Sequence, residues 1–212
     1  VLQEDFESVT VPAVPNTWTA MTGGGTADPW VTSATFTGSK AAFHDNDGTA
    51  AEWMRLWSPV VTIPPSSGGE TSYVALDFDL QYRLEADSVQ DVLAYDGLTL
   101  RIADLTGGQL LRSVLAEAFA TSIKTGTADG FPRHLPRNNN ANYFQDMSVW
   151  SGDSGGLVHV SMRLPAEGLV GRDVQLRFEY TEDATGSCPV GPCGIAVDNV
   201  VMRRVDLIPP VP

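Results

Sequence analysis

Residues 195–202 fit a final strand with an Asp-Asn step inside it, and hydrophobic and polar residues alternate with a period of two along four other segments, at residues 74–84, 98–102, 157–164 and 174–180. This period is typical of strands that bury one face. Stretches rich in Gly and Pro, such as 23–25, 64–69 and 107–108, separate them and indicate turns. Residues 109–120 fit either a short helix or another strand. The pattern predicts an all-β fold, a two-sheet antiparallel β-sandwich of the jelly-roll kind.

The length and composition fit a single domain over residues 1–205, followed by a Pro-rich linker at 206–212. The chain is 42% hydrophobic and 18% charged, as is usual for globular proteins. Its net charge of −13 repels phosphate backbones and anionic lipids, so it disfavours nucleic acid and membrane surfaces as partners. No stretch approaches the ~20 apolar residues of a membrane span.

The chain contains two cysteines, Cys188 and Cys193, with Pro and Gly residues between and beside them. These turn formers favour a small Cys188–Cys193 disulfide loop, which needs an oxidising and therefore extracellular compartment. A reduced pair is the alternative. A zinc site is disfavoured because no second Cys/His pair lies nearby in the sequence.

Several short motifs follow one another along nearly the whole chain, at residues 4–7 with Trp18, 38–43, 56–60, 95–100, 150–156 and 194–200. In their residues and in their order they resemble the motifs of the MAM-like jelly-roll modules, which include the choice-of-anchor J and cleaved-adhesin groups. Such modules are often appended to secreted bacterial peptidases such as immune inhibitor A. The resemblance implies a secreted, non-catalytic accessory or adhesion module. Its ligand would be a partner domain, a cell-surface glycan or a matrix protein.

A calcium site joining the first and last strands is a further expectation. Asp198 lies inside an apolar strand, where a carboxylate is costly without a partner. The chain ends of a jelly roll are commonly neighbours, so Glu7 can approach Asp198 and a hard cation can offset both charges. The family resemblance implies the same pair. Asp45 and Asp47 could add oxygens, although a solvated acidic turn explains them equally well.

The five tryptophans offer a different kind of binding site, because exposed aromatic rings stack on sugars. Core and edge packing is the commoner role. Trp53 and Trp57 are the expected exceptions, since Trp53 stands where the family pattern is polar. A carbohydrate-binding module of the same architecture is therefore the first alternative function.

The segment 152–156, Gly-Asp-Ser-Gly-Gly, resembles the nucleophile motif of chymotrypsin-like serine proteases. His44, Asp96 and Ser154 also follow that family's triad order. The residues that flank His44 and Asp96 do not match, and a turn that leads into the strand at 157 explains the motif more simply. A serine protease is the second alternative, and it requires His44 within hydrogen-bond reach of Ser154.

Overall fold

The computed structural model describes residues 2–24, 29–34, 36–45, 50–65, 72–86, 93–106, 110–113, 133–135, 147–184 and 192–207. Every regular element within these ranges is a β-strand. No described segment forms a helix that is long and apolar enough to cross a membrane. The strands are β1 (Leu2–Glu4), β2 (Thr19–Gly24), β3 (Val31–Ser33), β4 (Ala41–Asp45), β5 (Glu52–Trp57), β6 (Val61–Thr62), β7 (Ser72–Arg83), β8 (Gly97–Asp104), β9 (Leu110–Ser113), β10 (Arg133–Leu135), β11 (Met147–Val149), β12 (Val158–Pro165), β13 (Asp173–Glu182) and β14 (Gly194–Asp206).

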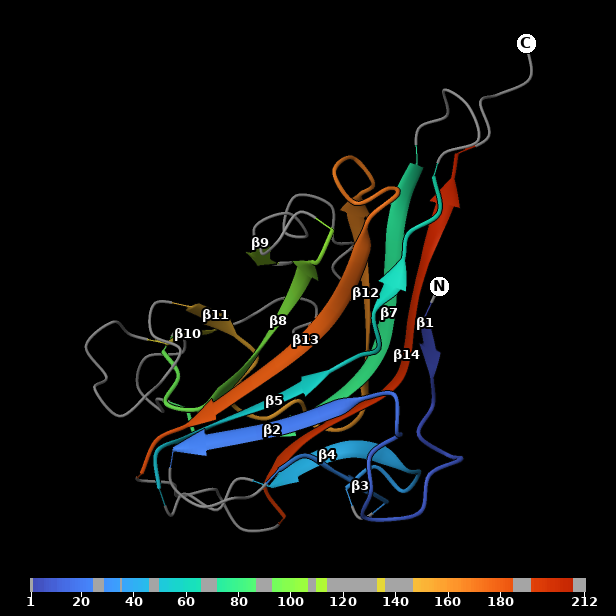
Figure 1. Ribbon diagram of the computed structural model, residues 1–212. Helices are drawn as coiled ribbons and strands as arrows, with labels where there is room; N and C mark the ends of the chain where they lie inside the picture. The colour runs from blue at the N-terminus through green and yellow to red at the C-terminus, as the bar shows by residue number, and fades with distance from the viewer. Residues whose placement is uncertain are drawn as a thin grey trace.

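Two antiparallel sheets of six strands each form the layers of the sandwich (Figure 1). Sheet A has the order β12-β7-β14-β4-β3, with β1 also paired to β14. Sheet B has the order β2-β5-β13-β8-β9, with β6 also paired to β13. The chain passes from one sheet to the other at each step from β4 through β5, β7 and β8, and again from β12 through β13 to β14. This alternation defines the jelly roll and confirms the expected fold class.

The four alternating segments correspond to β7, β8, β12 and β13, and the expected final strand at 195–202 corresponds to β14, so these strand predictions are confirmed. In the ambiguous stretch 109–120, residues 110–113 form strand β9, and 114–120 lie outside the described residues. β14 extends to Asp206, one residue into the expected linker. The linker's residues 208–212 also lie outside the described ranges.

The two ends of the described chain lie side by side, because β1 pairs with β14 through Leu2 opposite Met202 and Glu4 opposite Val200 (Figure 1). The register between β14 and β7 shifts after Asp198, where Asn199 adopts a φ of 51°. Asn is one of the few residues that tolerate this left-handed conformation. The resulting bulge lets Val197 and Val200 both face the core.

One hydrophobic core lies between the sheets. Trp18, Trp30 and Trp150 are buried in it, with exposed fractions of 5%, 2% and 0%. Core packing, the commoner role for tryptophan, is therefore confirmed for these three. Trp53 and Trp57 are only partly buried and belong to the outer side of sheet B.

Candidate functional site

Strand β5 carries two tryptophans and an arginine on the outer face of sheet B. Along this strand Met54 and Leu56 are fully buried in the core. Successive side chains of a strand point to opposite faces. Trp53, Arg55 and Trp57 therefore project from the face of sheet B that points away from the core, and each remains partly exposed.

The register of the neighbouring strands places further charged side chains on the same face. Arg177 of β13 lies opposite Trp57, and Arg101 of β8 lies opposite Arg177. In the next row Glu179 of β13 lies opposite Arg55. We call this surface the Trp–Arg face and define it by Trp53, Arg55, Trp57, Arg101, Arg177 and Glu179.

Each tryptophan of the Trp–Arg face has a guanidinium group over its ring. The Cζ atom of Arg55 is 4.2 Å from the ring centroid of Trp53. The Cζ atom of Arg177 is 3.9 Å from the ring centroid of Trp57. Such cation–π contacts limit the rotation of both partners, so they fix the orientation of the indole rings.

Glu179 joins two of the arginines. Its Oε1 atom lies 3.3 Å from Nε of Arg55, and its Oε2 atom lies 3.2 Å from Nε of Arg101. The glutamate side chain is only 1% exposed, whereas those of Arg55 and Arg101 are 31% and 15% exposed. The carboxylate therefore forms the buried base of the Trp–Arg face.

Trp53 is also fixed from below and from the side. A Cβ atom added to Gly23, its partner on β2, would lie 2.3 Å from the indole ring, so the ring covers the glycine closely. The ring also packs against a small cluster that contains Ala94 and Val149. On the β8 side, Val149 lies close to Gly97, where an added Cβ atom would be 2.5 Å from the valine side chain.

Arg177 is partly buried, and it forms no ion pair with the described residues. Its Nε donates to Oε1 of Gln175 at 3.2 Å, and no carboxylate of the described residues lies within ion-pair distance of it. Burial lowers the pKa of Arg177, and Arg55 and Arg101 lower it further, while Glu179 raises it. The Trp–Arg face is therefore a region of excess positive charge.

The expected pair Glu7 and Asp198 lies at a second place, where each carboxylate accepts a hydrogen bond from the turn at residues 39–40. Ser39 donates its hydroxyl hydrogen to Oδ2 of Asp198 at 3.3 Å, and the backbone N–H of Lys40 donates to Oε1 of Glu7 at 2.9 Å. The Nζ atom of Lys40 also donates to two backbone carbonyls, Glu7 O at 2.7 Å and Val9 O at 2.9 Å. We call this place the Glu7–Asp198 corner.

Asp198 is 3% exposed, as its position in an apolar strand suggested. Burial raises its pKa most, and the carboxylates of Asp79 and Glu7 raise it further. The backbone N–H of Asn199 and the hydroxyl of Ser39 act in the opposite direction. The structure thus brings Glu7 and Asp198 close enough to interact through their charges.

Asp45, a further proposed oxygen donor, lies away from this corner. Asp45 pairs with Gly194, four residues before Asp198 on β14. At ~3.3 Å per residue, this spacing separates the two backbones by ~13 Å. Asp47 lies outside the described residues.

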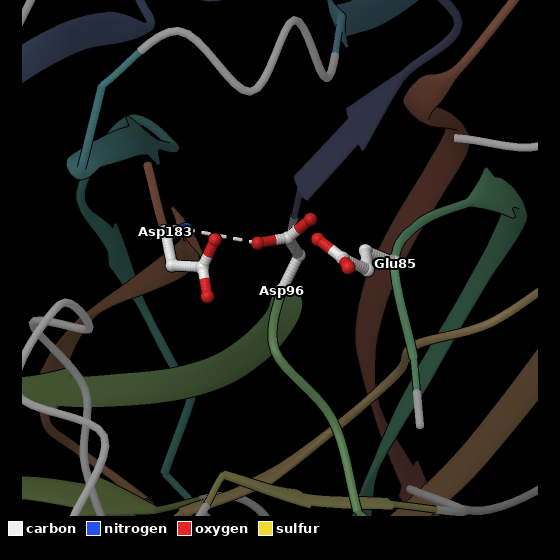
Figure 2. A group of neighbouring side chains, drawn as sticks. All are labelled: Glu85, Asp96 and Asp183. Atoms are coloured by element: carbon white, nitrogen blue, oxygen red, sulfur yellow. Dashed lines mark hydrogen bonds between the residues drawn. The ribbon is translucent and has the colours of Figure 1, made fainter. Parts of the chain in front are cut away.

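A third group of carboxylates, which the sequence analysis did not find, lies at one end of the sandwich (Figure 2). Glu85, Asp96 and Asp183 each offer an oxygen within 4.8 Å of the others. The backbone N–H of Asp183 donates to Oδ1 of Asp96 at 2.9 Å. These donors suit a hard cation, but three carboxylates provide only part of the six to eight oxygens that calcium usually takes. No regular spacing links the three positions, so the sequence contains no signal for them.

The Gly-Asp-Ser-Gly-Gly motif extends the edge of β7. Ser154 Oγ accepts a hydrogen bond from Tyr82 N at 3.0 Å, and it lies within donating distance of Tyr82 O at 3.1 Å and Gly156 O at 2.7 Å. Ser154 N also donates to Tyr82 O at 2.9 Å. The hydroxyl is therefore engaged with the backbone of the turn.

The triad that a serine protease needs is not assembled. Tyr82 and His44 both lie opposite Ile195, on its two sides, so their backbones are separated by two strand spacings, or ~10 Å. Ser154 lies beyond Tyr82 on the side away from His44. His44 itself is 3% exposed and packs between the rings of Trp30 and Tyr180. The protease alternative is therefore wrong, because His44 cannot reach Ser154.

Cys193 is in a disulfide. Cys188 lies outside the described residues, so the Cys188–Cys193 pairing stays a prediction.

Comparison with known proteins gives matches at the level of structure only. No family model and no curated protein matches the chain. One similar structure, of carbohydrate-binding modules from the β-sandwich superfamily, is 10% identical with a TM-score of 0.44, and the match covers 94% of this chain and 60% of that structure's chain. The family 11 carbohydrate-binding module of the cellulase Lic26A-Cel5E of Clostridium thermocellum is 11% identical, with a TM-score of 0.41, and the match covers 96% of this chain and 95% of the module. A lectin, UEA-II complexed with galactose, is 12% identical, with a TM-score of 0.43, and the match covers 96% of this chain and 98% of the lectin.

With TM-scores below 0.5, these similarities carry no weight for the function. The chain also spans only 60% of the length of the first of these structures. Membership of the MAM-like group stays a prediction, since no family model matches. A function for the chain is therefore argued from the side chains of the Trp–Arg face and not from these similar structures.

Proposed function

We propose that this chain is a non-catalytic glycan-binding module that serves as an accessory to a secreted bacterial protein, such as a peptidase. The observation that carries the proposal is the Trp–Arg face. Trp53 and Trp57 both project from the outer face of sheet B and are held in place by arginines. Partly exposed aromatic side chains on a rigid sheet offer apolar surface beside the guanidinium groups, against which sugar rings pack without ordering a loop.

The proposal is tested by binding to a panel of soluble and insoluble polysaccharides. Trp57→Ala should weaken binding by about thirtyfold or more, as expected for a tryptophan at the centre of a binding surface, which contributes about 2 kcal/mol. Tyr73→Ala is the matched control, because Tyr73 carries Arg163 over its ring on sheet A, away from the Trp–Arg face. Loss of binding in both variants, or in neither, would contradict the proposal.

A protein ligand is the second candidate, in keeping with an adhesion role. Tryptophan and arginine dominate the binding energy of protein interfaces, and the Trp–Arg face combines both. Two results together would favour this candidate: wild type binds no glycan of the panel, and it binds a partner protein that Trp57→Ala does not bind.

We further propose that the Glu7–Asp198 corner holds a structural calcium ion. Asp198 is buried close to two other carboxylates, Asp79 and Glu7, and a divalent cation would offset this repulsion. Glu7 and Asp198 would supply carboxylate oxygens, and Ser39 a hydroxyl oxygen. Two nearby carbonyls, Glu7 O and Val9 O, are already bound by the ammonium of Lys40.

The calcium proposal is tested by thermal unfolding with added calcium and with a chelator, since a ligand of the folded state raises the melting temperature. The increase should disappear in Asp198→Asn and persist in Asp96→Asn. The reverse result would place the ion at Glu85, Asp96 and Asp183 instead. No response of wild type to calcium would refute the proposal.

A further inference from the structure

The charge of the Trp–Arg face contrasts with that of the whole chain. The protein has a net charge of −13, yet this face combines three guanidinium groups with one carboxylate, that of Glu179. The outer face of sheet A carries both signs, since Asp77 and Asp79 lie there with Arg163 and Arg203. The Trp–Arg face therefore carries an excess of positive charge in a chain that is acidic as a whole.

The single carboxylate of the Trp–Arg face forms ion pairs with two of its three arginines. Glu179 is 1% exposed and contacts Arg55 and Arg101 at 3.3 and 3.2 Å. It forms no ion pair with Arg177, which lies two residues away on the same strand. A ligand that approaches Trp57 therefore meets a guanidinium group whose charge is not neutralised by a carboxylate of the described residues.

The position of Arg177 suits it to bind an anionic group beside a stacked sugar. Its guanidinium lies over the ring of Trp57 and its Nε is held by Gln175, so the group is oriented before a ligand arrives. In the described part of the chain, its two Nη atoms have no hydrogen-bond acceptor. A planar guanidinium binds carboxylates through two parallel hydrogen bonds, which a lysine cannot reproduce.

We propose that the ligand of the Trp–Arg face is an acidic polysaccharide with uronic acid residues, whose carboxylate binds Arg177 while the sugar ring stacks beside Trp57. This inference rests on the proposed glycan-binding function and specifies the ligand class. Binding of the carboxylate would also relieve the repulsion that Arg55 and Arg101 exert on Arg177. The same positive field would speed the association of a polyanion with a protein that is acidic elsewhere.

The test compares polygalacturonate oligosaccharides with their fully methyl-esterified forms, which keep the sugar rings and lose the charge. Calorimetry should show that wild type prefers the free acid by roughly ten- to a hundredfold, the range for a charge-assisted hydrogen bond. The preference should decrease as ionic strength rises. Arg177→Gln should lose the preference, and Arg177→Lys should keep only part of it.

Arg163→Gln is the matched control, because Arg163 also lies over an aromatic ring, that of Tyr73 on sheet A. It should bind like wild type, and thermal unfolding should show that all the variants are folded. Equal affinity for the acid and its ester, with binding lost in Trp57→Ala, would overturn the acidic ligand but leave glycan binding intact. Absence of binding to any glycan would overturn both. Tighter binding of a sulfated glycan than of polygalacturonate would overturn the assignment to carboxylates.

Discussion

Glu179→Gln should lower the stability of the protein without weakening its binding to an acidic glycan. The glutamate forms the buried base of the Trp–Arg face and contacts two arginines on either side of β13. The substitution keeps the size and shape of the side chain and removes its charge. One of the two arginines would then contact the amide oxygen and the other the amide NH2, which accepts no hydrogen bond, and no negative charge would offset the repulsion between the two guanidinium groups.

The expected magnitude follows from burial. Removing one partner of a fully buried ion pair costs about 3–5 kcal/mol. Water screens part of this interaction here, because Arg55 is 31% exposed and Arg101 is 15% exposed, which reduces the expected loss to about 2–3 kcal/mol. In a chain of 212 residues this loss corresponds to a decrease in melting temperature of about 4–12 °C.

Urea unfolding measures the effect through the midpoint at constant slope. Glu167→Gln is the matched control, because it makes the same chemical change at an exposed turn residue and should leave the midpoint unchanged. Equal midpoints for the two variants would refute the structural role of Glu179. If Glu179→Gln lowers the affinity for polygalacturonate more than the affinity for the neutral ester, the excess positive charge on which the ligand assignment rests would be contradicted.

Three further outcomes are expected. Gly23→Ala should displace the indole of Trp53, because its new Cβ would lie 2.3 Å from the ring, and should weaken glycan binding; an unchanged affinity would show that the position of Trp53 is unimportant. Asp198 has a pKa raised above its ordinary value of 3.8, so the folded state binds this proton more tightly than the unfolded state, and stability falls as pH rises from about 3.8 through the raised pKa. Asp198→Asn should lack this part of the pH dependence when unfolding is measured in chelator, and identical pH profiles would refute the assignment. Ser154→Ala should cost about 1–3 kcal/mol in urea unfolding, because the backbone N–H of Tyr82 loses Ser154 Oγ as its acceptor. A fluorophosphonate should leave wild-type Ser154 unlabelled, and stoichiometric labelling would contradict the structural role of Ser154.

Much of the fold could be predicted from the sequence because strand formation depends on a local pattern. The alternation at 74–84 and 174–180 has a period that only a strand with one buried face satisfies, and β7 and β13 form there. The first and last strands were expected to be neighbours in a jelly roll, and this is confirmed because β1 pairs with β14. The stretch 109–120 stayed ambiguous, because short apolar runs fit helices and strands equally.

The site could be predicted only in part, because its chemistry depends on register between distant strands. Trp53 and Trp57 were identified from the sequence, but Arg55 was not, although the alternation W-x-R-x-W in β5 puts it on the same face. The R-x-E pattern of Arg177 and Glu179 in β13 was equally visible, but nothing local shows that β13 lies beside β5. The same limit applies to Glu85, Asp96 and Asp183, which meet only in the folded chain.

The central claim is that a glycan binds on the Trp–Arg face, and the indole N–H signals in a two-dimensional NMR spectrum test it most directly. The five tryptophans divide into three in the core and two on the outer face of sheet B. On titration with polygalacturonate oligosaccharides, the signals of Trp53 and Trp57, assigned by substitution, should shift in a saturable manner. Those of Trp18, Trp30 and Trp150 should stay in place. Saturable binding that leaves Trp53 and Trp57 unshifted would contradict the account.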